Sequence, residues 1–437
     1  MYSLRAFEFH DPSELRAELA KHGVESSAQP EHLAKGLFRA FEIDGISPVL
    51  AQFLYQEIVL EGGDAVIPSR AQGTGDRTSD QAPAIDRRIE GSAKILLLGT
   101  EYQLRHLAIR VRTQAEGASV AGGEMALLAD DMERTLAAIG SENRGQVRIR
   151  ETEFTWGRRT YIMGIINLTP DSFSGDGVLA SGTQDWIERA VAHAEELVAG
   201  GADILDVGGE STRPGSQPTP AEEEYRRVIP LITRLRSRTN VPISIDTYKA
   251  EIARAALDAG ADLVNDVWGL RMDPEMKRVI ADRGVPIVIM HNRSRPKDAA
   301  QTERLGGRYV GVEYGDLLGD IIRELRAQIE LGRDAGIRDG QIIVDPGIGF
   351  GKTVEQNLEL VNRLDELRVL GYPILLGPSR KGFIGYTLDL PAAERLEGTA
   401  ATVAVGIVRG ADILRVHDVK PMTRVARMTD AIVRRPA

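Results

Sequence analysis

Residues 241–266 read VPISIDTYKAEIARAALDAGADLVND, and most of the chain repeats the unit seen in this stretch. Two short apolar runs, at 241–247 and 261–266, flank a helix-like segment at 249–259. Continuous Val, Ile and Leu runs are typical of strands covered on both faces, as in a parallel sheet. The Gly-Ala-Asp at 260–262 ends the helix and starts the next strand, because glycine supplies the left-handed residue that stops a helix. The stretch therefore predicts a strand–helix–strand unit.

The same alternation runs through the last two thirds of the chain. The predicted strands lie at 161–167, 202–209, 241–247, 261–266, 285–291, 341–347, 372–379 and 411–417. The predicted helices between and after them include 185–199, 222–236, 249–259, 317–335, 353–370, 395–409 and 421–433. The Gly-Ala-Asp turn recurs at 201–203 and 410–412. Eight such units predict a (β/α)8 TIM barrel over residues 157–437.

Residues 1–156 lack this rhythm and predict a smaller, mixed and mainly helical α/β domain. Helices are expected at 11–21, 31–41, 47–60, 101–112 and 123–139, and a buried strand at 94–98. Residues 68–86 are rich in Gly, Ser, Thr, Pro and Asp and predict a flexible loop. This N-terminal extension contains no chemical motif, so its function stays open.

The composition excludes several kinds of partner. The 437 residues carry 54 Lys and Arg against 64 Asp and Glu, a net charge of −10. We therefore expect no nucleic-acid or anionic-membrane surface, since both need clustered positive charge. The absence of cysteine excludes disulfides and thiolate metal sites. The first residues, MYSLRAFEFHDPSE, do not resemble a secretory signal, and no apolar run is long enough to span a membrane, so a cytoplasmic enzyme or binding protein is expected.

Hydrogen-bonding and ionisable residues follow nearly every predicted strand. In a barrel of this kind the functional face lies at the carboxyl ends of the strands, so these side chains should converge. They are Asn167, Glu210, Thr212, Arg213, Asp246, Asn265, Asp266, His291, Asp345, Ser379, Lys381, Arg415 and His417. Some have a plain structural alternative: Asp266 could cap a helix, and Asp171 could be only a turn residue after Pro170.

The strand-end residues fall into two chemical sets. Asp246, Asn265, Asp345 and Lys381 could read a flat heterocycle, since a carboxylate accepts two parallel hydrogen bonds from an amino group and a ring N–H. Asn167, Arg213, Arg415 and His417 suit a pyrophosphate, because arginine binds phosphate through two parallel N–H groups. Oxygens of Asn and Asp could also hold a hydrated Mg2+ that bridges phosphate oxygens.

The segment GIGFGKT at 347–353 looks like an ATP-binding phosphate loop but fails its spacing. The motif needs a glycine five residues before Gly351, and that position holds Pro346. We therefore expect the glycines to allow a tight turn after Asp345, with Lys352 at the start of a helix.

From about Thr160 to its end, the sequence resembles dihydropteroate synthase, a family of folate-pathway enzymes. The matching segments occur in family order: MGIINLTPDSFSGDG (163–177), DVGGESTRPGS (206–216), PISIDTYK (242–249), NDVWG (265–269), DPGIGFGKT (345–353), GPSRKGFIG (377–385) and RVHDV (415–419). The resemblance implies a TIM barrel that joins p-aminobenzoate to 6-hydroxymethyl-7,8-dihydropterin pyrophosphate and releases pyrophosphate. It also implies Mg2+ as cofactor, a homodimer and a target of sulfonamides.

The resemblance also implies a role for each matching residue. The pterin would be held by Asp246, Asn265, Asp345 and Lys381. The pyrophosphate would be bound by Asn167, Arg415 and His417. The p-aminobenzoate pocket would be lined by Thr212, Arg213, Ser379 and Phe173. The residues expected to carry catalysis are Lys381, Asp246, Arg415, His417 and Asn167. The metal ligands would be Asn167 and Asp176.

The chain departs from the family pattern in its first loop, where SGDG at 174–177 stands for the common Ser-Asp-Gly-Gly. Whether Asp176 or Asp171 approaches the metal is therefore open. The residues after His291, NRSRP, also differ from the family's usual Met-X-Gly-X-Pro. Two alternatives remain: a methyltetrahydrofolate-dependent corrinoid methyltransferase, which shares the pterin pocket, and a pterin-binding protein without catalysis.

Overall fold

The structure is a computed structural model that describes residues 9, 12–68, 93–117, 122–140, 145–168, 183–211, 218–295, 298–310 and 312–434. The chain divides into two compact units, Met1–Glu142 and Asn143–Pro436. Of the loop predicted at 68–86, all but Pro68 lies outside the described residues. Among the described residues, no helix combines the length and the apolar character needed to cross a membrane.

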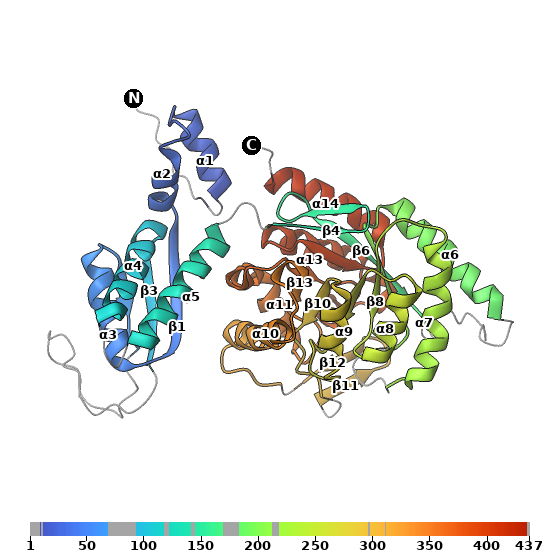
Figure 1. Cartoon of the computed structure of the whole chain (residues 1–437). Helices are drawn as coiled ribbons and strands as arrows, with labels where there is room; N and C mark the ends of the chain where they lie inside the picture. The colour runs from blue at the N-terminus through green and yellow to red at the C-terminus, as the bar shows by residue number, and fades with distance from the viewer. Residues whose placement is uncertain are drawn as a thin grey trace. The chain divides into compact units, whose positions relative to one another are not determined.

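The first unit is an antiparallel sheet of strand order β1-β3-β2 packed against helices (Figure 1). Its elements are α1 (Pro12–Lys21), α2 (Gln29–Gly36), β1 (Phe38–Ile46), α3 (Pro48–Leu60), β2 (Asp64–Val66), β3 (Ala93–Thr100), α4 (Glu101–Gly117) and α5 (Gly122–Gly140). Helix α3 starts at Ser47, whose hydroxyl accepts the Leu50 N–H. The mixed, mainly helical character predicted for this part of the chain is confirmed.

The helix predicted at 31–41 is wrong beyond Gly36. Strand β1 begins at Phe38 and pairs with β3 from Phe38↔Thr100 to Ile46↔Ala93. Leu97 and Ile95 of β3 are fully buried, so β1 pairs along its length with a strand of the apolar core. This pairing joins segments about fifty residues apart in the chain, and local sequence does not reveal it.

The second unit is the predicted eight-stranded parallel barrel with its helices outside (Figure 1). Its strands are β6 (Tyr161–Asn167), β7 (Ile204–Gly208), β8 (Ile243–Asp246), β9 (Leu263–Asp266), β10 (Ile287–Met290), β13 (Ile342–Asp345), β14 (Leu375–Leu376) and β15 (Ile413–Val416). Their order is β13-β10-β9-β8-β7-β6-β15-β14, and a parallel bridge between Val344 and Ile374 closes the ring. All eight predicted strands are confirmed.

The α-helices of this unit include α6 (Thr183–Gly200), α7 (Ala221–Arg236), α8 (Ala250–Ala259), α9 (Met276–Arg283), α10 (Leu317–Asp334), α11 (Val354–Asn362), α12 (Gly382–Leu388), α13 (Leu396–Val408) and α14 (Val419–Val433). Helices lie at all seven predicted positions of this unit, although the one predicted at 353–370 ends as an α-helix at Asn362, and α9 and α12 were not predicted. Within the described ranges of this unit, short 3-10 helices lie at Asp339–Gln341, Leu364–Leu370 and Ala392–Glu394. A hairpin that the sequence did not predict, β11 (Ala299–Thr302) and β12 (Gly306–Tyr309), lies between β10 and α10.

Alternation along each strand decides which residues enter the barrel. Outward residues such as Ile162, Leu205 and Ile243 belong to the large core between strands and helices. Inward residues such as Met163 and Ile413 belong to a second core inside the barrel. Because successive strand residues face opposite sides, the polar residues at the strand ends that share the inward parity must point into the barrel mouth.

A second hairpin, β4 (Gln146–Ile149) and β5 (Thr152–Thr155), plugs the opposite end of the barrel. Its Phe154 and the following Trp156 pack with Tyr161 of β6, with ring centroids 4.7 to 5.6 Å apart. All three side chains are buried, in one cluster with the inward strand residues. Residues 146–156 therefore belong to the compact unit of the barrel, although the sequence change near residue 157 placed them in the extension.

Candidate functional site

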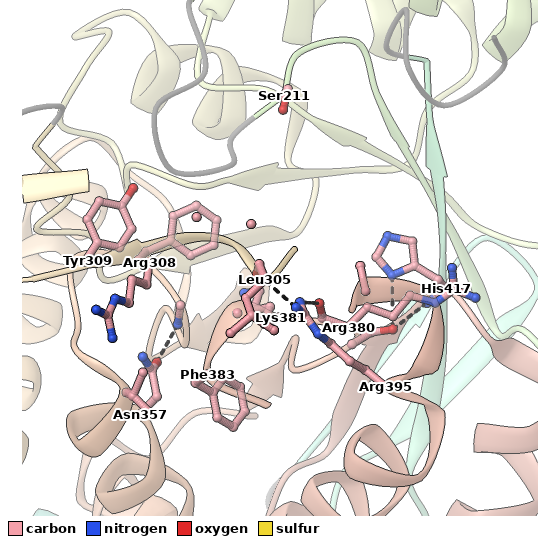
Figure 2. A pocket seen from close by; sticks show the side chains of 18 of the residues that line it. Ser211, Leu305, Arg308, Tyr309, Asn357, Arg380, Lys381, Phe383, Arg395 and His417 are labelled. Carbon is pink, nitrogen blue, oxygen red and sulfur yellow. Dashed lines mark hydrogen bonds between the residues drawn. The ribbon is translucent and has the colours of Figure 1, made fainter. Parts of the chain in front are cut away.

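A cavity of about 570 Å³ opens at the carboxyl ends of the barrel strands. Its wall includes six residues that the sequence singled out: Asn167, Glu210, Asp246, Ser379, Arg415 and His417. Lys381 lines it as well, and Figure 2 shows this lysine between Arg308 on one side and His417 on the other. The predicted convergence of strand-end residues is therefore present at one mouth.

Arg415 is the centre of the charged cluster in this cavity. Its Nε donates to Asp206 Oδ2 and its Nη2 to Asp246 Oδ2, both at 2.6 Å. Asn265 Nδ2 donates to the same Asp206 oxygen at 3.2 Å. Burial alone would lower the pKa of Arg415, but the two carboxylates raise it above its ordinary value. The two carboxylates therefore hold the Arg415 guanidinium in its charged form, in contact with Asp246 of the predicted pterin-binding residues.

Burial raises the pKa of Asp246 above its ordinary value, and the attraction of Arg415 opposes that rise. The Asp246 side chain is 8% exposed and reaches the cavity from the end of β8. A buried carboxylate with one oxygen on an arginine keeps its remaining lone pairs for a ligand. The site therefore offers a strong hydrogen-bond acceptor to a donor-rich heterocycle.

Asp345 and Lys381 form the second half of the cluster. Asp345 ends β13 and accepts the Gly347 N–H at 2.7 Å. Burial raises the pKa of Asp345, while the charge of Lys381 opposes that rise. Lys381 donates to the Ile348 carbonyl and lies over the Phe350 ring, 4.5 Å from its centroid. Burial lowers the pKa of Lys381 to about 8.

Ser379 and His417 form a pair at the end of β14 and β15. The Ser379 hydroxyl accepts the His417 backbone N–H at 3.1 Å and lies 3.0 Å from His417 Nδ1. Beside them, Arg380 forms an ion pair with Asp418. Ser379 is 5% exposed and lines the cavity, and its hydrogen bond to Nδ1 orients the imidazole.

The glycine-rich segment after β13 folds as a tight turn and not as a phosphate loop. Lys352 is 1% exposed, and its ammonium bonds Gly347 O, Phe350 O and His291 Nδ1 at 3.0 to 3.1 Å. Gly347 has φ +68°, and a Cβ there would lie 1.8 Å from the His291 carbonyl oxygen. The ammonium that would reach a phosphate in an ATP site is therefore used to hold this turn.

Two other residues left open by the sequence have structural roles. Asp266 faces outward and accepts the N–H groups of Trp268 and Leu270 at 2.8 and 2.7 Å, so it caps a turn. His291 is fully buried between Lys352 and Glu324, and burial and the lysine charge lower its pKa to about 3. Neither side chain lines the cavity.

Several predicted residues cannot be placed. Phe173, Asp176, Thr212, Arg213 and the alternative ligand Asp171 lie outside the described residues. Sequence reasoning also missed Asp206, which is fully buried and holds Arg415. Asp206 shares the inward parity of Ile204, so the alternation rule applied to β7 could have found it.

Replacing Arg415 by Ala should destabilise the fold by about 3–5 kcal/mol, because Asp206 and Asp246 would stay buried without a counter-charge. When the pKa of a carboxyl is higher in the folded than in the unfolded state, the folded state binds more protons, so the protein loses stability as pH rises. We therefore expect the deficit to grow between about pH 5 and pH 8, measured by urea unfolding. The control Arg380→Ala breaks an exposed pair and should cost below about 1 kcal/mol. Equal, pH-independent losses would contradict this account.

Comparison with known proteins gives a consistent match over the second unit. The sequence profile of the family described as "Pterin binding enzyme" matches residues 163–417, more than half of the chain. The dihydropteroate synthase of Clostridium beijerinckii is 49% identical over 290 residues, which cover 66% of this chain and all of that protein. A crystal structure of dihydropteroate synthase from Clostridium difficile, in the presence of pteroic acid, is 47% identical with a TM-score of 0.58 and covers 64% of this chain and 99% of that one.

A third relative extends into the first unit. The probable bifunctional folylpolyglutamate synthase/dihydropteroate synthase of Haloferax volcanii is 37% identical over 377 residues. The match covers 84% of this chain but only 40% of that protein. Because residues 143–436 alone make up about two thirds of the chain, this match includes part of Met1–Glu142. The extension is therefore shared in part with at least one relative.

Proposed function

The chain belongs to the pterin binding enzyme family, and we infer from the similarity of its barrel unit to dihydropteroate synthases that it is an enzyme with this activity. It joins p-aminobenzoate to 6-hydroxymethyl-7,8-dihydropterin pyrophosphate and forms 7,8-dihydropteroate and pyrophosphate. The observation that carries this conclusion is the 49% identity to a synthase whose entire length is matched by 66% of this chain. The roles of individual residues that follow are proposals.

We assign the pterin to Asp246, Asn265, Asp345 and Lys381. The amino group and ring N–H of a pterin form a pair of parallel donors, which a carboxylate such as Asp246 can accept together. Asn265 is held by Asp206 through its amide nitrogen, so its carbonyl oxygen, which has no partner among the described atoms, stays free to accept. These contacts favour a neutral, donor-rich ring over an anionic one.

We assign the leaving pyrophosphate to Arg415, His417 and Asn167. All three line the cavity, and Figure 2 shows His417 on the side away from Arg308 and Tyr309 of the hairpin. The bond between the exocyclic carbon and the pyrophosphate oxygen breaks, and its electron pair leaves with the phosphate. The amine nitrogen then forms the new C–N bond and loses a proton to water. The protein contributes positioning and charge stabilisation, and no nucleophile is required.

Mg2+ remains a proposal. Asn167 would offer one neutral oxygen, and Asp176, or alternatively Asp171, would offer a carboxylate from the first loop. Among the described residues no group of three His, Cys, Asp or Glu side chains could hold a metal. This donor set still fits Mg2+, which usually keeps several waters and binds through substrate phosphates. A bound ion would neutralise charge on the leaving pyrophosphate.

The p-aminobenzoate pocket is proposed to lie beside Lys381 and Phe350, with Ser379 at its inner end and Thr212, Arg213 and Phe173 contributed by the loops. The stacked Lys381 and Phe350 offer a flat apolar wall to an aromatic ring. A cytoplasmic location, and a separate role for the extension over residues 1–156, stay predictions from the sequence.

A homodimer is proposed through helices α13 and α14, which pack against each other. Val408 of α13 is 55% exposed and Met428 of α14 is 64% exposed, and both are apolar. Exposed apolar patches on neighbouring helices are typical of protein interfaces. Light scattering on the purified chain would show its mass in solution.

The decisive test of function is pyrophosphate release by the full-length chain. Release should require the dihydropterin pyrophosphate, p-aminobenzoate and Mg2+ together, with each omitted in turn as a control. A truncated chain that begins at Asn143 keeps the hairpin β4–β5 under the barrel and would show whether the first unit is needed. Bound pterin without release would instead favour a methyltransferase or a pterin-binding protein without catalysis.

A further inference from the structure

The wall of the cavity on the far side of Lys381 is built by the hairpin β11–β12. Leu305, Gly306 and Gly307 line the cavity together with Arg308 and Tyr309. Bonds that fix the hairpin to the end of the barrel include Tyr386 OH to Gly306 O at 3.0 Å and Arg395 Nη2 to Leu305 O at 2.9 Å. The wall is therefore a built part of the site.

The hairpin leaves no room for a side chain at the start of α12. A Cβ on Gly382 would lie 2.5 Å from the Gly307 carbonyl oxygen, closer than any real contact allows. Gly382 follows Lys381 directly and lines the same cavity. Position 382 therefore cannot supply a side chain to a ligand in the cavity, and any hydrogen-bond donor or cation beside it must come from another element.

Besides Arg415, which Asp206 and Asp246 hold, three other arginines of the cavity have their donors engaged. Arg304 pairs with Asp389 and Arg380 with Asp418. Arg395 is 3% exposed and donates to three backbone carbonyls, those of Leu390, Arg380 and Leu305. These three side chains are therefore held by the protein itself.

Arg308 differs from the other arginines. It is exposed, and within the described part of the chain it has no carboxylate partner. Its guanidinium lies over the Tyr386 ring, 4.5 Å from the centroid, which leaves the N–H groups at its edge available. Of the acidic residues that line the cavity, Glu303 in the turn of the same hairpin is nearest to Arg308 in sequence. Glu303 and Arg308 do not form an ion pair.

We propose that Arg308 binds the carboxylate of p-aminobenzoate, an assignment that rests on the proposed function. The amine of this substrate must face the pterin, and the carboxylate is on the opposite side of the ring, so it points away from Asp246 and Asp345. Arg308 of the hairpin lines the cavity on the side of Lys381 away from His417, so a cation is available to the carboxylate there (Figure 2). Arg308 thus determines specificity for an arylamine that carries an anionic group opposite its amine.

Binding of pteroate and of its carboxamide to the full-length protein would test this assignment by titration calorimetry. The two ligands differ only in the charge at the position that Arg308 is proposed to contact. Arg308→Gln should weaken pteroate binding by about tenfold to 100-fold, the usual range for a lost charged hydrogen bond. Binding of the carboxamide should change by less than about twofold, and Arg308→Lys should restore part of the loss.

Arg304→Gln is the matched control, because it changes a charge on the same hairpin that is already paired with Asp389. Binding of both ligands should stay within about twofold of the wild type, since Arg304 lies outside the proposed contact. Equal weakening of both ligands by Arg308→Gln would overturn the proposal. A charge-selective loss in Arg213→Gln but not in Arg308→Gln would move the carboxylate to the second loop and would also overturn it. A wild-type chain that binds neither ligand would overturn the proposed function itself.

Discussion

Replacing Asp246 by Asn is expected to lower kcat/KM for the pterin substrate by about 10²- to 10³-fold, equivalent to about 3–4 kcal/mol of lost binding in the transition state. The amide keeps the size of the carboxylate but accepts at only one atom, and its NH2 faces the donors of the pterin edge. A buried donor without an acceptor costs more than the lost bond alone. Steady-state kinetics with the pterin varied at saturating p-aminobenzoate would measure the change.

The fold should survive this substitution. Arg415 contacts both Asp206 and Asp246, so the variant still pairs one buried cation with one buried anion. Asp418→Asn is the matched control, because that carboxylate lies at the same mouth but pairs with the exposed Arg380. We expect the control to keep its activity within about threefold. A loss below tenfold in Asp246→Asn would remove this carboxylate from the pterin set.

Replacing Lys381 by Ala should lower kcat/KM by a similar factor, about 10²- to 10³-fold, because its ammonium lies among the buried carboxylates of the pterin set and over Phe350. The melting temperature should fall only modestly, because the buried Asp345 loses the charge of Lys381 but keeps the charges of Lys352 and Arg415 nearby. Kinetics for both substrates, beside thermal unfolding of the same samples, would separate a lost contact from a lost fold. Near-normal turnover would reject the assignment.

The pH dependence offers a second test of this lysine. Its pKa, lowered by burial to about 8, means that the charged form predominates below pH 8 and is lost above it. If the ammonium is required, kcat/KM should fall on the alkaline side with an apparent pKa near 8. Lys381→Arg keeps its charge at all these values, so its alkaline fall should move upward. An unchanged alkaline limb in this variant would assign the titration to another group.

The barrel could be predicted because its information is local. Each strand is a continuous apolar run, and several strand ends carry a polar residue at an inward position. Asp246 and Arg415 therefore reach the mouth by alternation alone, and the order of the strands follows from the repeated unit. Asp206 was missed although the same rule applies, since it lies within an apolar run and not at its end.

The hairpins and the sheet of the first unit could not be predicted in this way. Strand β1 is stabilised by β3 across a long connection. The hairpin β11–β12 is held by Tyr386 and Arg395, which lie 80 and 90 residues after the carbonyl groups that they bind. No periodic signal in residues 299–309 indicates these partners. Arg308 therefore became a candidate only when the structure showed that its neighbours were already paired.

The aromatic plug under the barrel gives this protein an internal optical probe. The chain has three tryptophans, Trp156, Trp186 and Trp268, and all belong to the barrel unit. Trp156 is 4% exposed between Phe154 and Tyr161, so unfolding of the barrel would expose its indole to water and shift its emission to longer wavelength. Circular dichroism reports helices of both units. A difference between the two denaturation curves would therefore measure the stability of the extension without any label.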